Sequence, residues 1–102
     1  MSDIKSYKDV YDYHGWREQN KHFISEAYEL AEAIHNYQVY DSVNNLNHVT
    51  EEVADIFFML NEIIEAYDID IDNVDDWLEY KRKRESKRIE EGYYERLRVS
   101  KE

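Results

Sequence analysis

The 102-residue sequence contains no proline and two glycines, Gly15 and Gly92. Proline and glycine are the residues that most readily interrupt a helix, so few positions in this chain can end one. Both glycines lie between stretches in which apolar residues recur at helical spacing. The length fits one compact domain and leaves no room for two. We therefore predict a single all-α domain that spans residues 1–102.

The spacing of apolar residues predicts four helices, over residues 4–14, 16–37, about 47–67, and from the acidic segment 68–72 to Gly92. Residues 41–47 are rich in Asn, Asp and Ser, which is typical of a loop. Any Asp of the acidic segment can cap the fourth helix, and a Tyr93–Tyr94 tail is expected after Gly92. We expect a four-helix bundle in which the second and third helices form an antiparallel pair.

The formal net charge of −11 argues against a nucleic-acid-binding surface, because phosphate backbones are held mainly by Lys and Arg. The sequence has no cysteine, which excludes disulfides, thiolate zinc sites and cysteine nucleophiles. No apolar run approaches the ~20 residues that a membrane-spanning helix needs. Residues 1–10 lack the apolar core of a signal peptide. We expect a cytoplasmic protein with no membrane partner.

Two pairs of acidic residues lie beside the apolar stripes of the second and third predicted helices. Glu26 and Glu29 are three residues apart, as are Glu52 and Asp55, so each pair shares a helix face. If the stripes pack together, all four carboxylates fall along one edge of the interface, where a divalent cation would offset their charge. Acidic pairs at this spacing also occur on ordinary solvated helix faces. The stripes are Phe23, Ala27, Leu30 and Ile34, and Val49, Val53, Ile56, Phe57, Leu60 and Ile64.

These residues resemble the signature of the MazG-like all-α nucleoside triphosphate pyrophosphohydrolases. The first half of that signature, E-x-x-E-L with a following Ala-Ile and an upstream Gly and Gln, is matched by Glu26–Leu30, Ala33-Ile34, Gly15 and Gln19. The second half, E-x-x-D in an apolar helix, is matched by Glu52–Asp55. The sequence departs from the family at Ser25, where a further Glu is usual. Ser25 cannot be an anionic ligand, but the four carboxylates are intact.

The resemblance implies Mg²⁺-dependent hydrolysis of (deoxy)nucleoside triphosphates to monophosphate and pyrophosphate, with Mn²⁺ as a possible substitute. It implies that Glu26, Glu29, Glu52 and Asp55 bind the metal, and that Glu29 and Glu52 serve catalysis. We favour Glu29 as the acceptor of the proton of the attacking water. A role in nucleotide-pool house-cleaning and a homodimer or homotetramer are also implied.

Cationic and aromatic residues supply candidates for holding the rest of a nucleotide. Lys81, Arg84 and Arg88 share one helix face with Trp77, and we assign these three cations to the triphosphate. The alternative is a solvated basic face that pairs with neighbouring glutamates. For the base, an aromatic ring can stack and an amide can read an edge. The candidates are Trp16, Gln19 and His22.

Three alternatives to this interpretation stay open. The residues Asp68, Asp70, Asp72, Asp76 and Glu79 follow the spacing of a calcium-binding EF-hand loop, although Asn73 stands where that loop needs glycine. An acidic interaction protein that occupies a basic groove is a second alternative. A phosphoribosyl-ATP pyrophosphatase-like hydrolase is the third, because those enzymes share the same metal motif.

Overall fold

A computed structural model describes the backbone of residues 3–101 and the side chains as far as residue 98. Within these residues the chain forms five helices and no strand, which confirms the all-α fold class. The helices are α1 (Tyr7–His14), α2 (Trp16–Val39), α3 (Val43–Ala66), α4 (Ile71–Glu90) and α5 (Tyr93–Lys101). They belong to two compact units, one ending at Ile69 and one beginning at Asp70. The single domain expected from the chain length stays a prediction.

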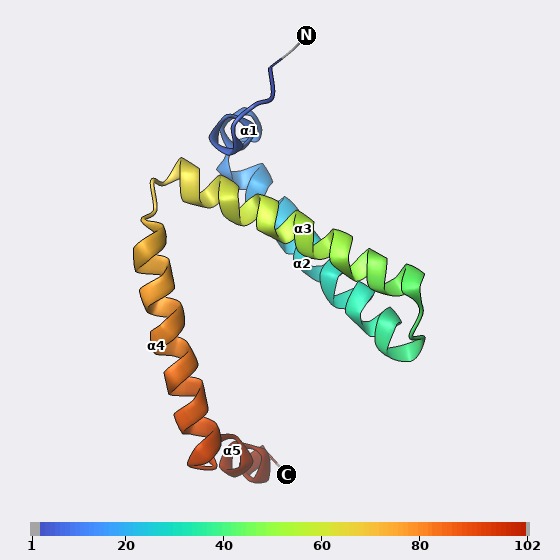
Figure 1. Cartoon of the computed structure of the whole chain (residues 1–102), viewed down its shortest axis with the longest axis vertical. Coiled ribbons are helices and arrows are strands. Elements are labelled where there is room, and N and C mark those ends of the chain that lie inside the picture. The colour runs from blue at the N-terminus through green and yellow to red at the C-terminus, as the bar shows by residue number, and fades with distance from the viewer. Residues whose placement is uncertain (1–2, 102) are drawn as a thin grey trace. The chain divides into compact units, whose positions relative to one another are not determined.

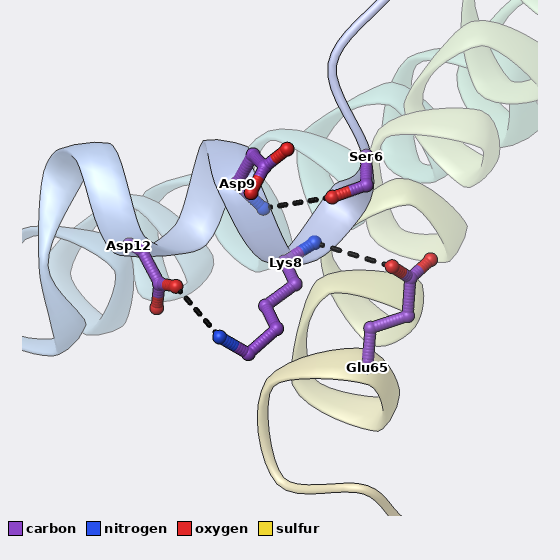
Figure 2. Close-up of polar contacts among 5 residues, drawn as sticks. All are labelled: Ser6, Lys8, Asp9, Asp12 and Glu65. Atoms are coloured by element: carbon purple, nitrogen blue, oxygen red, sulfur yellow. Dashed lines mark hydrogen bonds and ion pairs between the residues drawn. The ribbon is translucent and has the colours of Figure 1, made fainter.

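The first helix begins at a serine cap and contacts α3 (Figure 2). Ser6 Oγ accepts a hydrogen bond of 3.1 Å from the backbone N–H of Asp9, so α1 begins later than the predicted Ile4. The backbone N–H of Lys8 donates to Glu65 Oε1 on α3 at 3.4 Å, while Lys8 Nζ pairs with Asp12 at 3.0 Å. The Lys8–Glu65 hydrogen bond joins the start of α1 to the C-terminal part of α3.

Gly15 forms the junction between α1 and α2, as predicted. Its φ of 84° lies in the left-handed half of backbone space, which residues with a Cβ rarely adopt. Its N–H donates to the carbonyl oxygen of Tyr11 and closes the last turn of α1. The chain therefore turns sharply enough for α1 to pack against both α2 and α3.

The loop predicted over residues 41–47 is wrong for most of its length, because α3 already begins at Val43. Ser42 Oγ accepts a hydrogen bond of 3.1 Å from the backbone N–H of Asn45 and caps the helix. The Asn45 side chain donates to the carbonyl oxygens of Tyr40 and Asn36, at 2.9 and 3.3 Å. Polar residues typical of loops here form caps, and the connection between α2 and α3 is short.

The antiparallel helices α2 and α3 lie side by side and form the core of the first unit (Figure 1). Ala33 and Met59 are buried between them, with 1% and 4% of their surfaces exposed. No residue of the predicted apolar stripes is fully buried, because two helices in contact cover one seam of each. The half-buried stripe residues are Phe23, Leu30, Val49, Ile56 and Ile64. Within this unit the remaining stripe residues are exposed, namely Ala27, Ile34, Val53, Phe57 and Leu60.

The second unit consists of α4 and α5. Asp70 Oδ1 accepts from the backbone N–H of Asp72 at 2.9 Å and caps α4, as the acidic segment predicted. Residues 71–79 lie in this helix, so the alternative of a twelve-residue calcium-binding loop is wrong. The Tyr93–Tyr94 tail is also wrong, because both residues begin α5 after Gly92. No helix in the described part of the chain is long and apolar enough to cross a bilayer.

Candidate metal centre

Three carboxyl groups meet in the seam between α2 and α3. Glu26 comes from α2, and Glu52 and Asp55 come from one face of α3. One oxygen of each lies within 4.8 Å of the others. The prediction that acidic pairs from the two helices converge is thus correct for these three residues. Oxygen donors at such spacing fit a hard divalent cation such as Mg²⁺.

Two of these carboxyl groups are short of hydrogen-bond partners. Glu26 Oε2 and Glu52 Oε2 are buried and accept no hydrogen bond, and Glu52 has only 7% of its surface exposed. A buried carboxylate oxygen without a partner costs free energy, and such atoms are rare in folded proteins. A cation bound among the three groups would satisfy both oxygens. The residues present therefore fit a metal site.

The electrostatics of Glu26 reflect the same crowding. Burial raises the pKa of its carboxyl group, and the adjacent Asp55 carboxyl raises that pKa further. The charge of Glu29 acts in the same direction, while the hydrogen bond with His22 opposes it. The protein thus holds Glu26 where its charged form is disfavoured unless a positive charge is added.

Glu29, the fourth predicted ligand, is exposed on α2 and is not part of the three-carboxylate group. Its charge nevertheless reaches Glu26, one helical turn away. The structure therefore brings together three of the four predicted ligands, and the role of Glu29 stays a prediction.

A histidine contacts each glutamate of the cluster. His22 Nε2 lies 3.0 Å from Glu26 Oε1 and hydrogen-bonds it, and His48 Nε2 lies 3.3 Å from Glu52 Oε1. His22 was predicted to contact a base, and the structure places it against a candidate metal ligand. His48 was not predicted as a site residue. The signal for it was a His four residues before each of the two glutamates.

A buried polar pair in the same seam was also missed. Gln19 Nε2 donates a hydrogen bond of 2.6 Å to Glu62 Oε2. Gln19 was predicted to contact a base, and in the structure its amide nitrogen already donates a hydrogen bond to Glu62. Trp16, another predicted base contact, is more than half exposed and lies under the guanidinium of Arg17. Base contacts through these residues stay predictions.

The three predicted phosphate-binding residues lie on α4 in the second unit. Lys81 is exposed and has no ion-pair partner among the described residues. Arg84 stacks on the Tyr80 ring, and its Nε is buried without a hydrogen-bond partner. Arg88 lies over the Tyr93 ring at 5.0 Å and pairs with Glu85 at 3.5 Å. Phosphate binding by these cations stays a prediction.

Comparison with known families supports the interpretation of the carboxylates. The model of the MazG nucleotide pyrophosphohydrolase domain matches residues 17–89, a stretch that contains Glu26, Glu52 and Asp55. No curated protein and no solved structure gives a significant match to the chain. Because the family model covers more than half of the sequence and the acidic cluster lies within it, the chain belongs to the MazG nucleotide pyrophosphohydrolase domain family.

Proposed function

We propose that this protein is a Mg²⁺-dependent pyrophosphohydrolase that converts (deoxy)nucleoside triphosphates to the monophosphate and pyrophosphate. The observation that carries the proposal is the group of Glu26, Glu52 and Asp55, in which two buried oxygens have no hydrogen-bond partner. Membership of the MazG family supports the reaction class. Mn²⁺ has the same preference for oxygen ligands and is expected to substitute.

In this proposal Glu26, Glu52 and Asp55 hold the metal, and Glu29 completes the set. A bound Mg²⁺ would offset the negative charge of the phosphates and favour a nucleophilic water. The water oxygen forms a new bond to phosphorus, and the bond between the α- and β-phosphoryl groups breaks. Glu29 accepts the proton of that water, since its exposed carboxylate lies one turn from Glu26 and is reachable by solvent. Glu52 acts as a ligand close to the reacting atoms.

The remainder of the nucleotide is assigned to cations and to the start of α2. Lys81, Arg84 and Arg88 are proposed to hold phosphate oxygens. Trp16 offers an exposed aromatic face for stacking on a base, and Gln19 and His22 are the polar candidates near it in sequence. We propose that the protein is cytoplasmic and has a house-cleaning role in the nucleotide pool. In this proposal it has neither a nucleic-acid partner nor a membrane partner.

A second copy of the chain is the proposed partner of the first unit. Phe57 and Leu60 on α3 are 61% and 40% exposed, and Ile34 on α2 is 44% exposed. Apolar side chains gathered on one helix pair favour burial against another subunit. A homodimer or homotetramer would cover them.

The test is pyrophosphate release from a panel of canonical and modified nucleoside triphosphates with Mg²⁺, with phosphoribosyl-ATP included. We expect the wild type to release pyrophosphate and a monophosphate, and Glu52→Gln to lose at least about a hundredfold in rate, because the loss of a metal ligand removes the charge stabilisation. Glu51→Gln is the matched control, since Glu51 is an exposed neighbour outside the cluster. Inactivity of the wild type with both Mg²⁺ and Mn²⁺ would refute the proposal.

A further inference from the structure

The two glutamates of the acidic cluster share a contact that Asp55 lacks. His22 Nε2 lies 3.0 Å from Glu26 Oε1, and His48 Nε2 lies 3.3 Å from Glu52 Oε1. Each histidine precedes its glutamate by four residues, so the two are neighbours on one helix face. The residue four positions before Asp55 is Glu51, which cannot make such a contact. The same local arrangement therefore occurs once on each helix.

Within each glutamate the two oxygens have different surroundings. The histidine contacts Oε1, while Oε2 is buried and has no hydrogen-bond partner. A free carboxyl group rotates readily about its last torsion, which would exchange the two oxygens. A ring nitrogen in contact with Oε1 opposes that rotation: His22 does so through a hydrogen bond to Glu26, and His48 through a contact of 3.3 Å with Glu52. The contact leaves the same atom, Oε2, unpartnered in both glutamates.

The side chains of the two histidines are about half exposed. The side chains of His22 and His48 are 56% and 51% exposed, whereas those of Glu26 and Glu52 are 13% and 9% exposed. Each imidazole thus lies partly in solvent and contacts Oε1 of a glutamate whose side chain is mostly covered. The other two histidines behave differently, since His14 packs against the Tyr13 ring. His35 is exposed, without a hydrogen bond or ion pair in the described structure.

We propose that His22 and His48 are positioning residues that hold Glu26 and Glu52 so that Oε2 of each is presented to a divalent cation. This proposal rests on the metal site of the proposed function. Glutamate has one more rotatable bond than aspartate and loses more conformational freedom when a metal fixes it. Side chains that hold the ligands in place before the metal binds reduce that loss, as the residues around the ligands do at many protein metal sites.

The test is direct binding of Mn²⁺ to the full chain without nucleotide. Binding is measured by calorimetry and, independently, by the electron paramagnetic resonance signal of free Mn²⁺. His22→Leu and His48→Leu are each expected to weaken Mn²⁺ binding about tenfold, because each removes the imidazole that contacts a ligand glutamate. His22→Gln and His48→Gln retain an N–H donor at a similar reach and are expected to bind within about threefold of the wild type. His35→Leu on α2 is the control and leaves binding unchanged.

The outcomes separate the two proposals. Wild-type affinity in both Leu variants would overturn the positioning role, as would Gln variants that lose as much affinity as Leu variants. Absence of Mn²⁺ binding to the wild type would refute the metal site and this role together. Thermal unfolding without metal establishes that each variant is folded, and His22→Ala and His48→Ala replace any Leu variant that is not.

Discussion

Gln19 on α2 and Glu62 on α3 are joined by a hydrogen bond of 2.6 Å across the helix seam, with 6% and 1% of their surfaces exposed. Gln19 lies seven residues before Glu26, and Glu62 lies seven residues after Asp55. The antiparallel seam thus contains two polar layers, two helical turns apart. In one layer the Gln19 amide donates to Glu62 Oε2, while Glu62 Oε1 is buried without a hydrogen-bond partner. In the other layer three carboxyl groups lie close together, and Glu26 Oε2 and Glu52 Oε2 are buried without a hydrogen-bond partner.

Replacing Gln19 with Leu is expected to destabilise the fold, because Glu62 Oε2 loses its hydrogen bond inside the seam. A buried polar group left without its partner costs about 1–3 kcal/mol. Urea unfolding of the variant measures the loss. Gln38→Leu is the control, since Gln38 is exposed on the same helix. Equal stability of the two variants would show that the buried pair contributes nothing.

Divalent metal is expected to stabilise the protein. A ligand bound only by the folded state adds about 2.7 kcal/mol at a concentration one hundred times its Kd. Mg²⁺ or Mn²⁺ should therefore raise the Tm of the wild type and of Glu51→Gln. Glu52→Gln, which alters a member of the cluster, should show no rise. A rise of equal size in all three proteins would place the cation elsewhere.

The Tyr11–Tyr67 pair is expected to make stability fall at alkaline pH. The two hydroxyl oxygens lie 2.5 Å apart, and this hydrogen bond, followed by burial, raises the pKa of Tyr11 from 10.0 to about 12. Below pH 10 both states keep the proton. Between pH 10 and about 12 the unfolded state releases it first, so the free energy of unfolding decreases as the pH rises.

The measurement for this pair is the difference in unfolding free energy between wild type and Tyr11→Phe, followed from neutral to alkaline pH. Taking the difference cancels the contributions of the other tyrosines. The advantage of the wild type should shrink through the window from 10 to about 12. A difference that does not change with pH would contradict the shifted pKa.

Placing a charge on the exposed apolar face should dissociate the proposed oligomer. Phe57→Glu and Leu60→Glu each put a carboxylate where a second copy would bury an apolar side chain, which disfavours association. Light scattering after size exclusion gives the molar mass. Ile4→Glu is the control, because Ile4 is also exposed but precedes α1. A wild type that is already monomeric would refute the oligomer.

The sequence by itself determined the fold class, the helix breaks at Gly15 and Gly92, and the family. Helix formation and termination depend on residues within a few positions, so the absence of proline and the places of Gly15 and Gly92 were sufficient. The acidic pairs were equally visible, since residues three apart share a helix face. Capping was harder to predict. Ser42 begins α3 inside a stretch whose composition resembles a loop.

The tertiary structure alone decided which side chains meet across the seam. The rotation of α2 against α3 brings Glu26, Glu52 and Asp55 together in the cluster. It leaves Glu29 exposed, and the sequence of α2 alone does not show which of its two glutamates will face α3. The same rotation buries Gln19 against Glu62 and leaves Phe57 and Leu60 in solvent. Periodicity places residues on a face, but the packing of two helices decides how much of that face becomes the interior.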